Sequence, residues 1–207
     1  MRLEVRSVLR ARIRDFWDSV VGRPPEYASA PRMPEATHPL VRLAAEAITT
    51  FLSHQRVIEP PDTLFDEMPG ARMPAGVFVC LKHQGRLRGC IGTTEPIHAT
   101  LVVEVIHNAI GAAVRDPRFP PMQSVELERL EISVDVLGPS EPVPNVTVLD
   151  HRRFGIIVRS GERRGVLLPD IEGINSVAEQ VAAARDKAGL SADEPVEMFR
   201  FEVRRYR

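Results

Sequence analysis

The sequence predicts an α+β fold, in which helices flank a mainly antiparallel sheet. Segments with the periodicity of amphipathic helices are intermixed with short segments whose apolar residues alternate, as they do in half-buried strands. Neighbouring strand segments are separated by short turns that contain glycine, which is typical of hairpins. A regular strand–helix–strand rhythm is missing, so a parallel, doubly wound sheet is not expected.

The first 37 residues differ from the rest of the chain. Residues 1–21 carry apolar side chains at helical spacing, which predicts an amphipathic helix. Residues 22–37 contain four prolines and predict a linker or a surface wrap. Residues 1–17 lack the apolar core of a secretory signal, so we expect a cytoplasmic protein. In that compartment Cys80 and Cys90 are expected to be reduced thiols.

Three further helices are expected, over residues 38–54, 96–114 and 175–188. Each has an apolar stripe or a recognisable helix start. For the last of them, Asn175 or Ser176 is placed to accept the hydrogen bonds of the first turn. The proline-rich segment 60–74, which follows the first of these helices, is expected to form a loop.

The strand segments come mostly in pairs. Gly85 and Gly161 lie in the short turns of two expected hairpins, where glycine supplies the positive φ that a tight turn requires. The expected strands cover residues 77–82, 87–93, 130–137, 154–159, 164–168 and 196–206.

Composition points to an ordinary globular protein. Of its 207 residues, 43% are hydrophobic and 27% are charged, which argues against a largely disordered chain. The formal net charge is −1, so no overall field attracts nucleic acid or an anionic membrane. No apolar stretch approaches the roughly 20 residues that cross a bilayer. Neither nucleic acid nor a membrane is therefore expected as a partner.

The segment most suggestive of chemistry is Arg86-Leu87-Arg88-Gly89-Cys90-Ile91-Gly92-Thr93. Side chains alternate along a strand, so Arg86, Arg88 and Cys90 are expected on one face, where positive potential favours the thiolate of Cys90. Gly89 and Gly92 weaken the strand and can mark the close approach of a ligand. The alternative interpretation is a buried cysteine that packs as a small apolar residue.

The expected register of the first hairpin argues against a disulfide. With a two-residue turn at Gln84-Gly85, Cys90 opposes Val79, and Cys80 opposes Gly89. Directly opposed residues share a face, so the two cysteines are expected on opposite faces of the hairpin. A three-residue turn would reverse this parity.

Metal and cofactor sites are not expected. The sequence contains no CxxC or HxxxH spacing, no glycine-rich phosphate loop followed by lysine, and no GxSxG turn. His98 and His107 are nine residues apart in the expected helix over residues 96–114, which places them on opposite faces. We therefore expect no metal ion and no cofactor.

Several motifs together identify the chain as similar to one family. Leu87-Arg88-Gly89-Cys90-Ile91-Gly92, Asp116-Pro117-Arg118-Phe119-Pro120-Pro121 and Leu130-Glu131-Ile132-Ser133-Val134-Asp135-Val136-Leu137 resemble the AMMECR family, in the family's order. Shorter matches follow at residues 165–169 and 187–190. Residues 38–207 are therefore expected to form an AMMECR-type domain, and residues 1–37 an extension outside it.

The resemblance implies more about fold than about function. It implies a larger α+β part built from both chain ends and a smaller part built from the middle, with the Cys90 motif at a cleft between them. No catalytic activity is established for the family as a whole. Bacterial members are often encoded beside a MEMO-like protein and a radical S-adenosylmethionine protein, so genomic association alone makes these two candidate partners. A homo-oligomer remains open.

The first functional hypothesis is a cysteine-dependent enzyme. Cys90 is the candidate nucleophile, and Arg88 stabilises its thiolate or holds an anionic substrate. A base is also wanted, because thiols are commonly activated by histidine. His83 in the hairpin turn and His98 at the start of the next helix are the candidates.

The second hypothesis is a non-catalytic adaptor whose cleft binds a partner or a small ligand. Gly89 and Gly92 would admit a close backbone, and Arg88 and Arg118 would hold a carboxylate or a phosphate. Asp116 and Arg118 have two interpretations. They line the same cleft, or they form an ion pair that ends the preceding helix and holds the loop in place.

Overall fold

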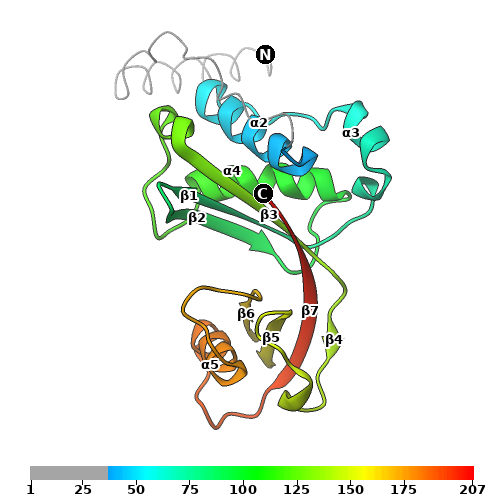
Figure 1. Cartoon of the computed structure of the whole chain (residues 1–207), viewed down its shortest axis with the longest axis vertical. Coiled ribbons are helices and arrows are strands. Elements are labelled where there is room, and N and C mark those ends of the chain that lie inside the picture. The colour runs from blue at the N-terminus through cyan, green and yellow to red at the C-terminus, as the bar shows by residue number, and fades with distance from the viewer. Residues whose placement is uncertain (1–36) are drawn as a thin grey trace, which may run out of the picture. The chain divides into compact units, whose positions relative to one another are not determined.

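The structure, a computed structural model, describes residues 37–207 (Figure 1). The helix expected over residues 1–21 lies outside the described residues, as does the proline-rich segment up to residue 36. Among residues 37–207, no helix is both long enough and apolar enough to cross a membrane.

An antiparallel sheet of seven strands organises the described chain. Its main path runs in the order β2-β1-β3-β7-β5-β6, and β4 pairs with β7 beside this path. The expected α+β class is confirmed, and each expected strand is present to within one residue at either end. The strands are β1 (Val77–His83), β2 (Arg86–Thr93), β3 (Leu130–Leu137), β4 (Glu141–Pro142), β5 (Phe154–Ser160), β6 (Arg163–Leu167) and β7 (Glu197–Tyr206).

The three expected helices are all present as α2, α4 and α5, but not every boundary lies where it was expected. Residues 60–74, which were expected to form a loop, contain a short α-helix and a 3₁₀ turn. Pro61 is the N-cap of the helix and Pro69 begins the 3₁₀ turn, positions where a missing N–H costs nothing. The elements are α2 (Pro39–His54), α3 (Asp62–Glu67), α4 (Leu101–Val114), α5 (Val177–Lys187) and the 3₁₀ turns η1 (Pro69–Arg72), η2 (Ser124–Arg129) and η3 (Val146–Val148).

The start of α4 is the largest boundary error. This helix begins at Leu101, capped by the Thr100 hydroxyl, rather than at residue 96. The buried Glu104 carboxylate accepts the backbone N–H groups of Ile97 and His98 at 2.9 and 2.8 Å, which holds the preceding segment in a non-helical turn.

The expected separation of the two histidines near α4 is therefore wrong. Because His98 precedes the helix, its ring is free to fold back over the first turns of α4. It stacks on the ring of His107 with centroids 4.2 Å apart. An argument from helical spacing does not apply to a residue outside the helix.

The start of α5 is confirmed. The Ser176 hydroxyl accepts the N–H of Glu179, and the Glu179 carboxylate accepts the N–H of Asn175 at 2.8 Å. Gly189 follows the helix with a φ of +63°, the left-handed conformation that ends many helices.

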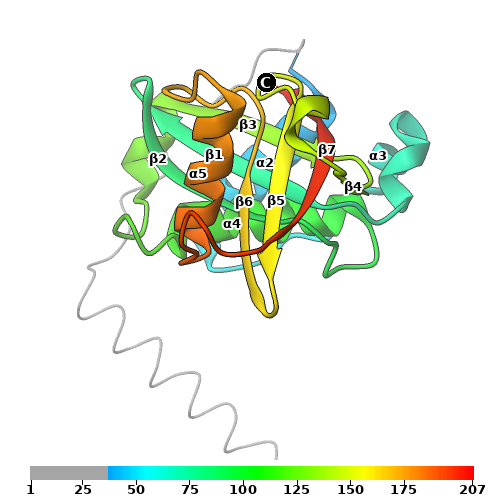
Figure 2. The same cartoon turned by 90° about the horizontal axis from the view of Figure 1, so that it is seen from below.

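Two hairpin–helix units make up most of the fold. The hairpin β1–β2 carries α4 on one face, and the hairpin β5–β6 carries α5 (Figures 1 and 2). In each unit a glycine lies where the helix crosses the second strand. A Cβ on Gly89 would lie 2.0 Å from the Ala112 carbonyl oxygen, and one on Gly165 would lie 1.8 Å from that of Ala184. Both contacts bring a helix backbone against a strand, which only glycine allows.

The two larger apolar clusters draw on different parts of the chain, and a third, smaller cluster contains Leu137, Ile157, Leu168 and Phe201. The largest cluster draws on α2, α4, β1 and β3 and also contacts Tyr206 near the end of the chain. The second cluster contains only residues between Val143 and Met198. Strand β7 pairs with β5 along its first half and with β3 along its second half, so it joins the two parts.

The register of β1 and β2 differs from expectation by one residue. The turn is the expected one, since His83 opposes Arg86 and both Gln84 and Gly85 have positive φ. Beyond the turn, however, Arg88 is an extra residue that forms a β-bulge, so that Cys80 opposes Cys90. The predicted placement of the two cysteines on opposite faces is therefore wrong.

Candidate functional site around the Cys80–Cys90 pair

Cys80 and Cys90 form a disulfide between β1 and β2. The backbone N–H of Cys90 points away from β1, so the two residues are a non-hydrogen-bonded pair, in which opposed side chains come closest together. Their side chains lie on the face of the sheet opposite α4 and are partly exposed. The expectation of two free thiols is wrong for this form of the protein, because the bulge at Arg88 brings both cysteines to one face.

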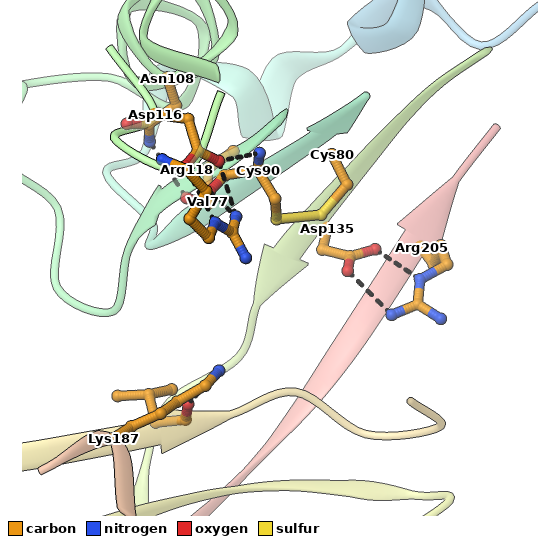
Figure 3. Close-up of a disulfide and its surroundings, with 10 residues drawn as sticks. Val77, Cys80, Cys90, Asn108, Asp116, Arg118, Asp135, Lys187 and Arg205 are labelled. Carbon is orange, nitrogen blue, oxygen red and sulfur yellow. Dashed lines mark hydrogen bonds and ion pairs between the residues drawn. A yellow bond between two sulfur atoms is a disulfide. The ribbon is translucent and has the colours of Figure 1, made fainter. Parts of the chain in front are cut away.

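The edge of β2 at Cys90 is closed by the loop that follows α4 (Figure 3). The buried carboxylate of Asp116 accepts the N–H of Cys90 at 2.8 Å. Arg118 donates from its Nε and Nη2 to the two oxygens of this carboxylate, at 2.9 and 2.6 Å. Its Nη2 also reaches the carbonyl oxygen of Cys90 at 3.3 Å. The expected ion pair at the end of the helix is thus present, and it places a guanidinium beside Cys90.

These contacts set the charge states of the pair. Hydrogen bonds from Arg118 and, to a smaller extent, from the backbone N–H of Cys90 hold the pKa of Asp116 well below its usual range. The carboxylate in turn raises the pKa of Arg118. Both groups are therefore ionised at neutral pH. The side chain of Arg118 is 54% exposed, so the ion pair is only partly shielded from solvent.

Arg88 does not act on Cys90 in the way the strand alternation predicts. Because it lies in the bulge, its side chain turns to η2, where it forms a two-pronged ion pair with Glu126 at 2.6 and 2.9 Å. This pairing lowers the pKa of Glu126. The third guanidinium nitrogen of Arg88 is buried and has no hydrogen-bond partner among the described residues.

We expect the Arg88–Glu126 pair to stabilise the fold by about 1–2 kcal/mol, because both side chains are largely buried and the geometry is two-pronged. A double-mutant cycle with Arg88→Met and Glu126→Gln, followed by urea unfolding, measures this coupling energy. The exposed pair Arg153–Glu202 is a matched control, and its coupling should stay below about 0.5 kcal/mol. Equal coupling in the two cycles would contradict the prediction.

The other predicted site residues have described contacts with groups other than the disulfide. Gly89 contacts the backbone of α4, so the close approach that it permits is that of a helix and not of a ligand. Gly92 lies under the ring of Phe78, whose atoms would be 2.3 Å from an added Cβ. His83 follows Leu81 on the helix-covered face of β1, and His98 stacks on His107. Neither histidine has a described contact with Cys90.

Two cationic residues near the disulfide were not singled out from the sequence. Figure 3 shows the side chain of Lys187, at the end of α5, directed towards the disulfide and Arg118. Burial and the nearby Arg118 charge lower the pKa of Lys187, whose ammonium donates to the Val166 carbonyl oxygen at 3.3 Å. Arg205 of β7 binds the buried Asp135 of β3 through two hydrogen bonds of 2.8 and 2.9 Å.

The sequence gives little indication that these residues lie near Cys90. Lys187 lies in one of the short family matches and is one of only two lysines in the chain, but it is 97 residues from Cys90. Asp135 and Arg205 are 70 residues apart and are paired only because β3 and β7 are neighbours. Within residues 37–207 no group of three or more histidine, cysteine, aspartate or glutamate side chains is arranged to hold a metal ion.

Comparison with known proteins places the chain in a family. The family model described as AMMECR1 matches residues 41–206, which include the disulfide, Asp116, Arg118 and Lys187. The chain belongs to the AMMECR1 family. The match begins three residues after the expected domain start at residue 38 and leaves the N-terminal extension outside it.

Relatives within the AMMECR1 family cover most of this chain. A Thermotoga maritima protein is 46% identical over 172 residues, which are 82% of this chain and 98% of that protein. A Clostridium acetobutylicum protein is 41% identical over 82% of this chain, but the match spans only 36% of that longer protein. The crystal structure of an uncharacterised protein from Pyrococcus horikoshii, 36% identical, superimposes with a TM-score of 0.73 and covers 80% of this chain and 88% of that one.

Proposed function

We propose that the protein is a cysteine-dependent enzyme whose nucleophile is the thiolate of Cys90, with the Cys80–Cys90 disulfide as its oxidised, inactive form. The observation that supports this proposal is the position of Arg118. Its guanidinium is held by the buried Asp116 and donates to the carbonyl oxygen of Cys90, so a permanent positive charge lies beside the cysteine. A fixed cation of this kind favours a thiolate over a thiol.

The proposed activation is electrostatic. A dithiol reductant supplies the two electrons and two protons that convert the Cys80–Cys90 disulfide into two thiols, and is itself oxidised to a disulfide. The thiol of Cys90 then loses its proton to solvent. Arg118 and Lys187 stabilise the resulting thiolate. The ion pair with Asp116 offsets part of the Arg118 charge as well as the Asp116 charge, so the proposal also needs the charge of Lys187, which has no ion pair among the described residues. No described contact joins a histidine to Cys90, so His83 and His98 have no part in this mechanism.

A second candidate, a non-catalytic ligand-binding adaptor, is favoured by the disulfide itself. Both sulfur atoms are bonded to each other, and in this form neither attacks a substrate. Such a protein would use the cationic groups around the disulfide only to bind. Association with MEMO-like and radical S-adenosylmethionine proteins, with or without catalysis, stays a prediction.

Alkylation of the reduced, folded protein distinguishes the two candidates. We expect the rate at Cys90, followed peptide by peptide by mass spectrometry, to reach its plateau well below the pH of about 8.5 at which a free thiol titrates. Arg118→Gln should move this plateau to higher pH, because it removes the adjacent cation. Arg86→Gln, at the exposed start of the same strand, is the matched control and should leave the profile unchanged.

The Cys80 peptide from the same samples serves as the internal reference. The nucleophile proposal would be contradicted if the pH dependence of the Cys90 alkylation rate equalled that of the unfolded chain, or if Cys90 were not labelled until the protein was denatured. Either result would favour the adaptor.

A further inference from the structure

The cations near the disulfide differ in how they are neutralised. Arg205 lies against the buried Asp135, and the Asp170 charge also acts on it. Arg118 is paired with Asp116. Lys187 has no ion pair among the described residues, and its only described hydrogen bond is to a carbonyl oxygen. Of these three cations, Lys187 alone has no acidic partner among the described residues.

Lys187 and Arg118 also lie close enough to repel each other. The Arg118 charge contributes to the lowered pKa of Lys187, after the larger effect of burial. Two cations brought together from different elements, the end of α5 and the loop after α4, are unfavourable unless an anion lies between them. Figure 3 shows both side chains directed towards the same side of the disulfide.

Both groups keep unused hydrogen-bond donors. Arg118 uses its Nε and Nη2 for Asp116 and the Cys90 carbonyl oxygen, and its Nη1 has no hydrogen bond to the described residues. The Lys187 ammonium has three N–H donors and one described acceptor. The unused donors match an oxyanion, which accepts several charge-assisted hydrogen bonds at once.

We propose that Lys187 and Arg118 bind an acidic group of the substrate, a carboxylate or a phosphate, next to Cys90. The inference rests on the proposed function for the role of Cys90, but the anion site stands on the two cations alone. Lys187 binds the anion with its ammonium, and Arg118 binds it with Nη1 while Asp116 holds the other edge of the guanidinium in place. The substrate is thus an electrophile that carries a negative charge.

Two alkylating reagents with the same reacting carbon test this charge preference. In each reaction the sulfur of Cys90 forms a bond to the CH₂ carbon and iodide leaves, but iodoacetate carries a carboxylate and iodoacetamide a neutral amide. We expect the ratio of the iodoacetate rate to the iodoacetamide rate to be at least about tenfold higher for Cys90 in the folded, reduced protein than in urea. Lys187→Met should abolish this excess, and Lys187→Arg should retain most of it.

The chain offers a matched control for the lost charge. Lys82 is the only other lysine and lies on β1, on the same face as Cys80. Lys82→Met should change the ratio less than twofold. An equal effect of the two lysine substitutions would indicate that positive charge anywhere on the protein, and not Lys187 in particular, favours iodoacetate. That result would overturn the assignment to Lys187.

A binding measurement keeps the anion site testable without any thiol reaction. Inorganic phosphate and acetate are titrated separately, at constant ionic strength, into the oxidised and the reduced protein, and the amide NMR signals of Cys90 and Arg118 are followed. We expect at least one of the two anions to give saturable shifts that disappear in Lys187→Met. The anion with the tighter binding identifies the acidic group as phosphate or carboxylate.

The outcomes separate the two proposals. Fast alkylation of Cys90 with no charge preference and no anion-dependent shifts would overturn the anion site and leave the nucleophile in place. Unreactive Cys90 with Lys187-dependent shifts would overturn the nucleophile and leave the anion site. Failure of both measurements would overturn both proposals.

Discussion

Gly89→Ala is expected to lower the free energy of unfolding by about 3 kcal/mol, the largest effect of any single methyl addition near the site. The added Cβ would lie 2.0 Å from the carbonyl oxygen of Ala112, and this contact joins two backbones, so no side chain can move aside to relieve it. Either α4 or β2 must shift. Urea unfolding measures the change as a lower midpoint at an unchanged slope.

Two further glycines make this prediction specific. Gly165→Ala should have a similar effect, because a Cβ there would lie 1.8 Å from the Ala184 carbonyl oxygen. Gly70→Ala is the matched control, since nothing lies within 4 Å of its added Cβ, and its effect should stay within about 0.5–1 kcal/mol, with either sign. An unchanged midpoint for Gly89→Ala would show that α4 does not cross β2 at this residue.

Asp116→Asn is expected to cost about 2–3 kcal/mol at neutral pH. The carboxylate is buried and accepts hydrogen bonds from the Cys90 N–H and from Arg118, whose charge would be left unpaired. This value lies at or below the lower end of the range of about 3–5 kcal/mol that is typical when one partner of a buried ion pair is removed. The reason is that the half-exposed Arg118 can be hydrated. Asp150→Asn is the control, since this exposed carboxylate also accepts backbone N–H groups and should have a smaller effect.

The effect of Asp116→Asn should depend on pH in a definite direction. The folded-state pKa of Asp116 is lowered, mainly by its hydrogen bonds from Arg118, so the unfolded chain takes up the proton first as pH falls. The stabilisation is complete above about pH 5 and is lost progressively below about pH 4. The difference in unfolding free energy between wild type and variant should therefore shrink on acidification. A constant difference between pH 7 and pH 3 would contradict the assigned role of the charge.

Local features of the fold could be predicted because they depend on neighbouring residues. The turn at Gln84-Gly85 and the cap at Ser176 follow from what these residue types do within a few positions of themselves. The start of α4 could not be predicted in this way. It depends on the buried Glu104, which draws the preceding backbone into a turn and so overrides the apolar periodicity.

Some of the contacts around Cys90 agree with the expectation from the sequence. Cys90, Asp116 and Arg118 do come together, as two neighbouring motifs suggested. Arg88 was assigned to the wrong partner, because a one-residue bulge changes the face on which each following side chain lies. Its actual partner, Glu126, is 38 residues away, and no local pattern marks it.

By itself, the sequence determined the α+β class, the strands, the two hairpin turns and the family, since each depends on periodicity, turn chemistry or ordered motifs. Only the tertiary structure decided that Cys80 opposes Cys90, that Arg118 lies beside them and that Lys187 reaches the same place from α5. The physical reason is distance along the chain. Contacts between residues tens of positions apart depend on how strands pair and where helices cross them, and a shift of one residue in either changes which side chains meet.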